Sequence, residues 1–176
     1  MDEIILKVPN KEYKDQVMNY KKVFEDNNQS FDGCAGLEDV NTFEEWIDFE
    51  NRLKEKYGDS YVPSDVYLGI RKSDNKLVGL IDFRHDLNEF MFNYGGNIGY
   101  SVLVEERRKG YAKEMLRQLL IKCKEYGKDK VLLCCDKDNV GSWKTILANG
   151  GILENEVEDK VNLSESGVIQ RYWINL

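Results

Sequence analysis

The fold is decided by residues 97–126, which read N-I-G-Y-S-V-L-V, then E-E-R-R-K-G-Y-A, then K-E-M-L-R-Q-L-L-I-K-C-K-E-Y. Residues 98–104 are rich in β-branched and aromatic side chains and follow two glycines, which predicts a strand. Downstream, apolar residues recur at helical spacing and predict a helix with one buried stripe. This stripe consists of Ala112, Met115, Leu116, Leu119, Leu120 and Cys123. Between strand and helix lies a short basic turn.

This turn has the chemistry of an anion site. The first N–H groups of a helix lack partners within the helix and lie at the positive end of its dipole. A phosphate can accept hydrogen bonds from them. Gly110 lets the backbone approach a ligand closely, and the small Ala112 keeps that approach open. The basic side chains of residues 107–109 add positive charge. The sequence therefore predicts a strand–turn–helix that holds a pyrophosphate.

The spacing excludes two common phosphate motifs. No Gly-Lys-Ser/Thr follows four spacer residues, as a Walker A loop requires, and one glycine is too few for G-x-G-x-x-G. The pattern Arg-x-x-Gly-x-Ala, opening a helix directly after an apolar strand, resembles the acyl-CoA turn of the GCN5-related N-acetyltransferase (GNAT) superfamily. The resemblance implies that acetyl-CoA is held by Arg107, Arg108, Lys109, Gly110, Tyr111 and Ala112. A basic strand–helix turn without a ligand is the alternative interpretation.

Composition sets the broad class of the protein. The chain has 176 residues, of which 41% are hydrophobic and 32% charged, and this size suits one domain. No apolar run approaches the roughly 20 residues of a membrane span, and no signal peptide is evident, so we expect a cytoplasmic protein. The net charge of −7 disfavours nucleic-acid binding and suits a cationic substrate.

Cysteine usage gives no sign of a metal or redox site. The four cysteines form no C-x-x-C, and His85 is the single histidine, so a zinc site is not expected. Cys134 and Cys135 lie in an apparent strand, and Cys123 lies on the apolar stripe of the helix. Buried small hydrophobic residues are the preferred interpretation, over nucleophiles.

The remaining chain predicts an alternation of strands and helices. A strand at residues 3–8 precedes two helices, of which the second begins at Thr42 with a capping box and ends at Gly58 after Tyr57. A hairpin of residues 66–70 and 77–85 follows, and residues 86–93 are predicted to be a connection. Beyond the central helix we expect a strand at 130–135, a short helix around Trp143, and strands at 152–157 and 168–174.

This order predicts a single α/β (α+β) domain spanning residues 1–176. We expect a mixed, mostly antiparallel twisted sheet of about seven strands with about four helices packed on it. The same order matches the GNAT fold over nearly the whole chain. Within that superfamily, residues 95–151 closely resemble a bacterial branch labelled "predicted acetyltransferase". The resemblance implies that the first two helices shape the acceptor side.

The resemblance also places the rest of the donor. In the family the central strand separates from its neighbour, and the pantetheine arm adds to the freed backbone like a short strand. Here that backbone belongs to Ser101, Val102, Leu103 and Val104, and an N–H near Val102 would face the thioester oxygen. Asn139 and Ser142 match the asparagine and small residue that begin the last helix and contact pantetheine. A plain helix N-cap is the alternative role for Asn139.

Catalytic groups are less well indicated. Many family members carry a tyrosine seven residues after the asparagine, as the acid that protonates the departing thiolate, but this chain has Ile146 there. Asn97 stands near the position of the usual carboxylate base and cannot act as one. His85 is the first candidate base, because histidine titrates near neutral pH, with Asp82 and Glu89 as alternatives. Tyr100 is a second candidate catalytic residue, although a core or substrate-wall role is its default interpretation.

Taken together, these residues predict an acetyl-CoA-dependent N-acetyltransferase that acts directly on a small primary amine without a metal. A non-catalytic acyl-CoA-binding or regulatory domain is one alternative, motivated by Ile146 and the unclear base. An enzyme that acetylates aminoacyl-tRNA is another, which the acidic composition disfavours. The acceptor and acyl chain length are not readable, and homodimers are common among relatives, so a homodimer stays open.

Overall fold

The computed structural model describes residues 2–54 and 62–176 and confirms the predicted seven strands and four α-helices. The predicted end of the second helix, at Tyr57 and Gly58, lies outside the described residues. The strands are β1 (Ile4–Lys7), β2 (Ser64–Arg71), β3 (Lys76–Arg84), β4 (Ile98–Val102), β5 (Lys130–Asp136), β6 (Ile152–Glu158) and β7 (Val168–Asn175). The helices are α1 (Lys14–Asp26), α2 (Phe43–Leu53), α3 (Tyr111–Glu125) and α4 (Val140–Leu147).

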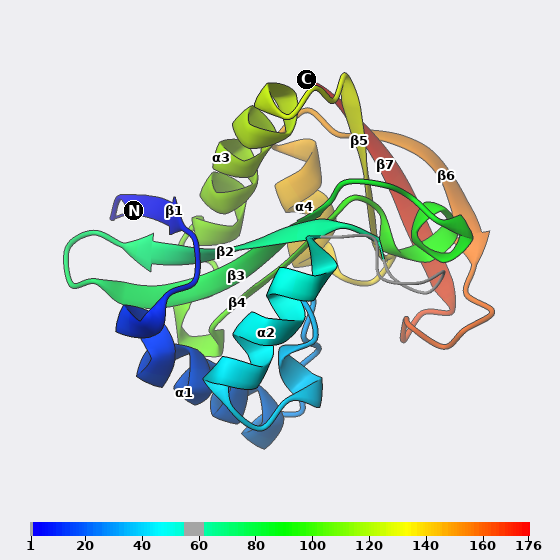
Figure 1. The fold of residues 1–176 in the computed structure, drawn as a ribbon. Helices are drawn as coiled ribbons and strands as arrows, with labels where there is room; N and C mark the ends of the chain where they lie inside the picture. The colour runs from blue at the N-terminus through cyan, green and yellow to red at the C-terminus, as the bar shows by residue number, and fades with distance from the viewer. Residues whose placement is uncertain (1, 55–61) are drawn as a thin grey trace.

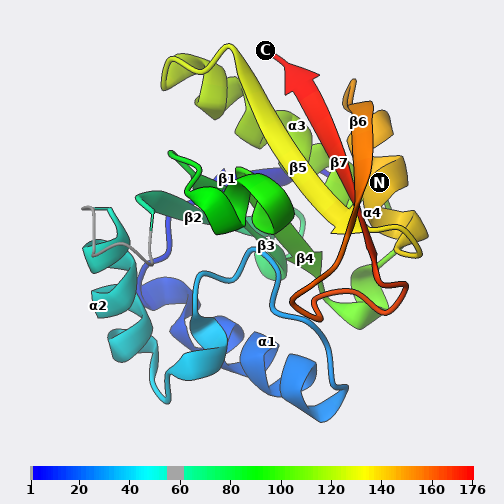
Figure 2. The same ribbon diagram turned by 90° about the vertical axis from the view of Figure 1, so that its right-hand side faces the viewer.

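The strands form two antiparallel sheets, one in the order β1-β2-β3-β4 and one in the order β5-β7-β6. Helices α1 and α2 cover one face of the larger sheet, and α3 and α4 lie on the opposite side (Figure 1). Figure 2 shows β5, β7 and β6 grouped apart from the first four strands. β4 and β5 meet at a single bridge between Gly96 and Leu133. The predicted separation of the central strand from its neighbour is therefore present.

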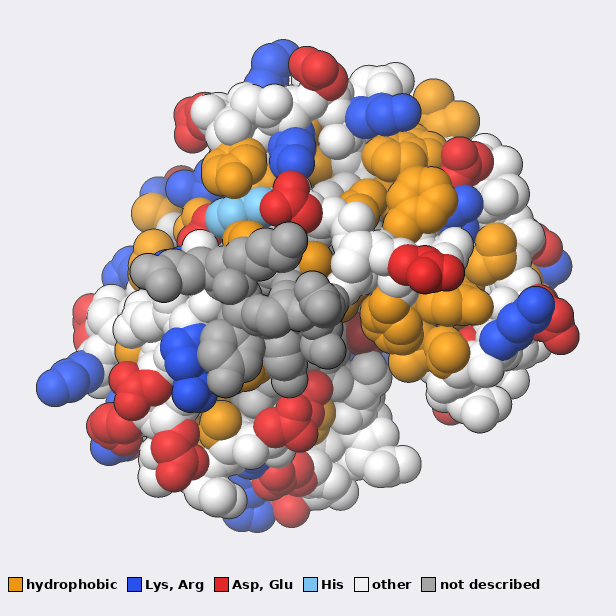
Figure 3. Space-filling view, turned by 45° about the vertical axis from the view of Figure 1, so that its right-hand side comes forward, with side chains coloured by type: hydrophobic (Ala, Val, Ile, Leu, Met, Phe, Trp, Pro, Cys, Tyr) orange, Lys and Arg blue, Asp and Glu red, His pale blue; other side chains and the backbone are white. Residues whose placement is uncertain are grey.

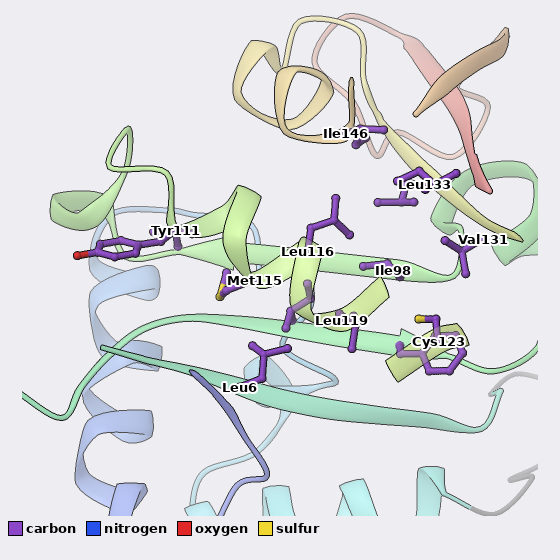
Figure 4. Packing of buried hydrophobic residues seen from close by; sticks show 14 of the residues in the cluster. Leu6, Ile98, Tyr111, Met115, Leu116, Leu119, Cys123, Val131, Leu133 and Ile146 are labelled. Atoms are coloured by element: carbon purple, nitrogen blue, oxygen red, sulfur yellow. The ribbon is translucent and has the colours of Figure 1, made fainter. Parts of the chain in front are cut away.

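The central helix packs as its apolar stripe predicted. Met115, Leu116, Leu119 and Cys123 are fully buried, and they pack against residues of both sheets (Figure 4). A second core lies between the larger sheet and α1 and α2, where Trp46 is fully buried. Burying each large apolar side chain contributes roughly 1.5–3 kcal/mol. The two cores hold the basic turn and the end of β4 in a fixed relation.

Three local predictions meet different outcomes. The capping box is confirmed, because the Thr42 hydroxyl accepts from the Glu45 N–H while the Glu45 carboxylate accepts from the Thr42 N–H. The central strand ends at Val102, two residues earlier than predicted, because a 3-10 turn (Val104–Glu106) follows. The connection after β3 contains a π-helical turn, Met91–Gly95, which its mixed polar and aromatic sequence did not indicate.

Asn97 joins the two sheets at the point where they separate. Its side chain is 4% exposed. Its Oδ1 accepts from the Leu132 N–H at 2.8 Å, its Nδ2 donates to the Arg84 carbonyl at 3.0 Å, and its N–H donates to the Leu132 carbonyl at 2.6 Å. Through these bonds, Asn97 links β3 to β5 in place of strand pairing. The residue that stands near the position of the family's usual base therefore has a structural role in this chain.

Replacing Asn97 by Ala should lower the free energy of unfolding by about 2 kcal/mol, because it leaves the Leu132 N–H and the Arg84 carbonyl unpaired in the interior. Chemical denaturation monitored by circular dichroism measures this loss. Asn93→Ala is the matched control, since the Asn93 amide makes one exposed hydrogen bond, and it should change stability by less than about 0.5 kcal/mol. Equal effects of both substitutions would contradict the role given to Asn97.

Candidate functional site

The basic turn presents a row of unpaired backbone N–H groups. Arg108 (φ 61°) and Gly110 (φ 88°) both adopt the left-handed conformation, and Gly110 is the N-cap residue of α3. Within the described part of the chain, the N–H groups of residues 108–113 donate to no acceptor, whereas the Glu114 N–H bonds the Gly110 carbonyl. Residues 107–110 are exposed. Such consecutive N–H groups at a helix start form a concave anion site, which we call the N–H cradle.

The three basic side chains beside the N–H cradle differ in their contacts. The Nε of Arg107 donates to the Val102 carbonyl at 3.0 Å. The Nζ of Lys109 lies 2.8 Å from the buried Glu106 carboxylate, so its charge is balanced. The Arg108 side chain makes no hydrogen bond or ion pair with any residue that the structure describes. Of the three predicted basic residues, Arg108 is thus unpaired among the described residues, Arg107 bonds a neutral carbonyl, and Lys109 forms an ion pair with Glu106.

Glu106 holds the basic turn in place through three ion pairs. Its carboxylate is 3% exposed and receives the Arg71 guanidinium, the Lys76 ammonium and the Lys109 ammonium, each at 2.8 Å. Arg71 also donates to the Tyr111 hydroxyl at 3.2 Å, which fixes the first residue of α3. Burial opposes ionisation of this carboxyl, but the three hydrogen-bonded cations lower the pKa of Glu106 to about 2. The turn that forms the N–H cradle is thereby fixed to β2 and β3.

Glu106→Gln should destabilise the fold by about 2 kcal/mol at pH 7, because it leaves three cations without their shared carboxylate. The pKa of Glu106 is lower in the folded state than its ordinary value. Its contribution is therefore complete above about pH 5 and is lost as the pH falls towards 2. Denaturation curves between pH 3 and 7 measure this dependence. The exposed neighbour Glu105, with one Lys76 contact at 3.5 Å, supplies the control Glu105→Gln, which should leave the curve nearly unchanged.

The free edge of β4 lies beside the N–H cradle. β4 is the last strand of its sheet. The Leu103 N–H donates to the Val78 carbonyl of β3 at 2.9 Å. Because peptide groups alternate in direction along a strand, those of Val102 and Tyr100 face away from β3. The Arg107 contact with the Val102 carbonyl agrees with this orientation. An unpaired strand edge of this kind can accept an extended ligand as an added strand.

The four residues predicted to line this edge occupy different environments. The Ser101 hydroxyl points into the protein, where it accepts from the Tyr20 hydroxyl at 3.0 Å and contacts the Cys34 thiol at 3.3 Å. Leu103 is buried in the core beneath α1 and α2, and Val104 lies beyond the strand with an exposed side chain. Val102 and the preceding Tyr100 are therefore the residues whose backbone faces the free edge.

Three predicted residues meet at the start of α4. The Asn139 side chain accepts from the Ser142 N–H at 3.0 Å, which confirms its N-cap role. The Tyr100 hydroxyl lies 3.0 Å from the Ser142 hydroxyl and donates to the Ser142 carbonyl at 3.1 Å. Burial raises the pKa of Tyr100, so its phenol holds its proton at neutral pH. β4 and the start of α4 are thus linked through a protonated tyrosine.

Ile146 belongs to the core. It is fully buried and lies near Leu133 of β5 in Figure 4. A surface hollow of about 520 Å³ adjoins the same helix, between Lys137, Trp143 and Tyr172, but no residue of β4 lines it. We therefore place the candidate site at the free edge of β4 and the N–H cradle.

His85 is set apart from this site. Its Nε2 lies 2.8 Å from the Asp65 carboxylate, and its ring packs on Phe83 and Tyr126 with centroids 4.9 and 4.4 Å away. Tyr100 pairs with Ile81 across the sheet, so His85 lies four residues further along β3, roughly 13 Å away. Its contacts describe a structural histidine. Glu89, the other alternative base, is exposed beyond the end of β3.

Asp82 of β3 has its side chain on the face of the sheet that the α1–α2 loop covers. It pairs with Gly99, and its Oδ1 accepts the Gly99 N–H at 2.8 Å while its Oδ2 lies 3.2 Å from Arg84. The carboxyl is 3% exposed. Burial raises the pKa of Asp82, although Arg84 and the Gly99 N–H oppose the rise. A buried carboxylate with a raised pKa suits proton abstraction near neutral pH.

The loop between α1 and α2 closes over this position. Gly33 (φ 74°) approaches β4 so closely that a Cβ atom would lie 2.4 Å from the Gly99 carbonyl oxygen. The neighbouring Asp32 is exposed, and its charge acts on both Tyr100 and Asp82. The buried Lys21 holds the later part of the loop by donating to the carbonyls of residues 37, 38 and 40 at 2.7–3.0 Å.

Sequence reasoning missed Lys21, Asp32 and Glu106. A lysine in the otherwise polar part of α1 gives no signal that it is buried, and Glu106 is indistinguishable from Glu105 by pattern. The glycines of the loop marked a turn but not its contact with β4. These roles arise from contacts between segments far apart in the chain.

Cys34, Cys123 and Cys135 are buried free thiols and Cys134 is partly buried, in agreement with the preferred interpretation. Residues 2–54 and 62–176 contain no group of three or more potential metal ligands, and no helix within them is long and apolar enough to cross a membrane. In Figure 3, basic side chains on the coloured part of this face are scattered among acidic ones, while hydrophobic side chains gather on the right.

Both the sequence and the fold of this chain are similar to those of known acetyltransferases. The model of the family described as "Acetyltransferase (GNAT) family" matches residues 20–150. No curated protein sequence matches this chain significantly. Among solved structures, the microcin C7 self-immunity acetyltransferase MccE, in complex with acetyl-CoA and AMP, is 20% identical, with a TM-score of 0.71 over 100% of this chain and 94% of that one.

Two further structures are similar over almost the whole chain. The yncA protein of Salmonella typhimurium with its cofactor acetyl-CoA is 13% identical, with a TM-score of 0.69, and 98% of this chain and 94% of that one are covered. The ribosomal-protein-S5-alanine acetyltransferase of Vibrio fischeri is also 13% identical, with a TM-score of 0.68 over 99% and 94% of the two chains. At these identities the likeness concerns the fold.

Proposed function

Because this chain belongs to the acetyltransferase (GNAT) family, we propose that it transfers an acetyl group from acetyl-CoA directly to a primary amine of a small acceptor. The observation that carries the proposal is the junction of two features at one place. One is the N–H cradle at residues 108–113, and the other is the free edge of β4. The cradle suits the pyrophosphate of CoA, and the edge suits its pantetheine arm. Two structural neighbours hold acetyl-CoA.

The donor would lie along β4 with its thioester near Tyr100. An N–H of the free edge, near Val102, would donate to the thioester oxygen and stabilise the developing oxyanion. Asn139 is occupied as the cap of α4, so its contact with the arm would be made by the remaining lone pair or by the Nδ2 group. The hydroxyl of Tyr100, held by Ser142, carries a proton that could pass to the departing thiolate.

Asp82 is the residue we propose as base, in place of His85. It lies beside Gly99 on the acceptor side of β4, whereas His85 is engaged with Asp65 and two rings. A cationic amine would be drawn to Asp32 and Asp82, and Asp82 would take its proton directly or through one water. The neutral amine then attacks the thioester carbon, the C–N bond forms and the C–S bond breaks. The Tyr100 proton passes to the CoA thiolate, and the second proton lost by the amine nitrogen returns to the Tyr100 oxygen through solvent.

The test is a screen for turnover. The wild-type protein is incubated with acetyl-CoA and a panel of small mono-, di- and polyamines, and the release of free thiol is measured. The proposal predicts at least one amine whose addition raises thiol release well above spontaneous hydrolysis, with the acetylated product confirmed by mass spectrometry. Binding of acetyl-CoA with no amine-dependent release across the panel would contradict direct acetyl transfer to small amines.

A non-catalytic acyl-CoA-binding domain is the second candidate function. The observation that favours it is Ile146, a core residue at the position where the family resemblance places the tyrosine that protonates the departing thiolate. This candidate predicts acetyl-CoA binding of normal strength without turnover. Tyr100 of β4 weakens the case for this candidate, because its phenol contacts the start of α4 and supplies a proton there.

A further inference from the structure

Arg107 occupies the edge that a donor would use. Its side chain turns back from the start of the turn, and its Nε donates to the Val102 carbonyl at 3.0 Å. That carbonyl faces the free edge of β4, as the direction of the Leu103 N–H requires. In a ligand added as a strand, an amide N–H would bond this same oxygen. Arg107 and the pantetheine arm therefore compete for one acceptor.

The N–H cradle begins at the next residue. In the ligand-free protein it offers backbone N–H groups and the Arg108 side chain, while Lys109 is balanced by Glu106. Any diphosphate could use these N–H groups, including that of an ordinary nucleotide. While its Nε–H bonds the Val102 carbonyl, the Arg107 side chain is held against the free edge of β4.

We propose that Arg107 determines donor specificity by exchanging partners, an inference that rests on the proposed function. When a pantetheine amide takes the Val102 carbonyl, Arg107 is released and pairs with the diphosphate that lies in the N–H cradle. A nucleotide without the pantetheine arm leaves Arg107 on Val102 and gains only the cradle and Arg108. Arg107 therefore favours CoA over ADP and ATP, which carry the same kind of diphosphate.

The exchange makes a distinct prediction for Arg107→Ala. Its affinity for CoA should fall roughly tenfold, the usual effect of losing one charge-assisted hydrogen bond. Its affinity for ADP should stay within about twofold of the wild-type value. D-pantetheine, which lacks the diphosphate, should bind the variant at least as well as the wild type, because its competitor at Val102 is gone. Isothermal titration calorimetry, or competition against a fluorescent CoA analogue, measures all three affinities.

Arg108→Ala is the matched control, because Arg108 is exposed, adjacent and free of side-chain partners in the described chain. Its loss should weaken CoA and ADP by similar factors. An equal loss of CoA and ADP affinity in Arg107→Ala would overturn the exchange and make Arg107 a simple phosphate ligand. Unchanged CoA affinity in that variant would also overturn it. If the wild type binds no CoA, the proposed function fails as well, so the two failures are distinguishable.

Discussion

Gly110→Glu is expected to weaken acetyl-CoA binding by roughly a thousandfold. Gly110 has φ 88°, which a residue with a Cβ atom adopts only under strain, so the first turn of α3 would shift. The new carboxylate would also stand among the N–H groups of residues 108–113 and repel a diphosphate. Both effects act at the same place, so their costs combine. Equilibrium binding of acetyl-CoA by calorimetry measures the loss.

The control for Gly110→Glu lies at the other end of the same helix. Gly127 has φ 101°, and no heavy atom lies within 4 Å of the position that a Cβ atom would take there. Gly127→Glu therefore imposes comparable backbone strain and the same charge. It should lower thermal stability to a similar extent while leaving acetyl-CoA affinity within about twofold. If Gly110→Glu bound acetyl-CoA like the wild type, the N–H cradle would not be the diphosphate site.

Asp82→Asn should lower kcat/KM for the amine by roughly a hundredfold or more, which is the usual size of general-base catalysis. The amide keeps an Oδ1 atom to accept the Gly99 N–H, so the local fold is retained. Acetyl-CoA affinity should change by less than about twofold, because the carboxyl lies on the acceptor side of β4. Initial rates of thiol release, measured at several concentrations of the amine found in the screen, give the change in kcat/KM.

The pH dependence separates catalysis from structure. Burial raises the pKa of Asp82 above its ordinary range. Activity that needs its carboxylate therefore rises with pH through that raised pKa. The charge of Asp32 acts on Asp82 with the same sign, and that of Arg84 acts with the opposite sign. The acid limb of the kcat/KM profile should be absent in Asp82→Asn.

The control for this substitution is Asp86→Asn, because Asp86 is exposed beyond the end of β3. It should leave both the rate and the pH profile unchanged. Retention of the wild-type acid limb in Asp82→Asn would exclude Asp82 as the base. Loss of that limb in His85→Gln instead would restore the histidine, which the register places roughly 13 Å along the strand from Tyr100.

The sequence carried most of the fold because its local signals agreed with each other. The strand–turn–helix order at residues 97–126, the capping box at Thr42 and the alternation of strands and helices were all predicted, apart from the end of the central strand. The misplaced end of the central strand has a local cause. The apolar Leu103 and Val104 continue a strand pattern, yet Leu103 turns into the core under α1 and a 3-10 turn follows. Pattern alone does not distinguish these outcomes.

The candidate site was predictable in its backbone and less so in its side chains. The N–H cradle follows from a glycine at a helix start, which local sequence specifies. The partners of Arg107, Lys109 and Asp82 depend on segments that approach each other only in the fold. The ion pair of Lys109 with Glu106 is not predictable from the pattern, because the buried carboxylate cannot be recognised among neighbouring acidic residues. The ordinary titration of histidine favours His85 as a base but says nothing of its position.

We propose that the N–H cradle and the free edge of β4 together bind acetyl-CoA. Titration of acetyl-CoA into the wild-type protein by isothermal calorimetry tests it most directly. We expect saturable binding of one acetyl-CoA per chain, at micromolar affinity or tighter. Heats no larger than those of dilution at millimolar acetyl-CoA would show that this site does not bind the donor.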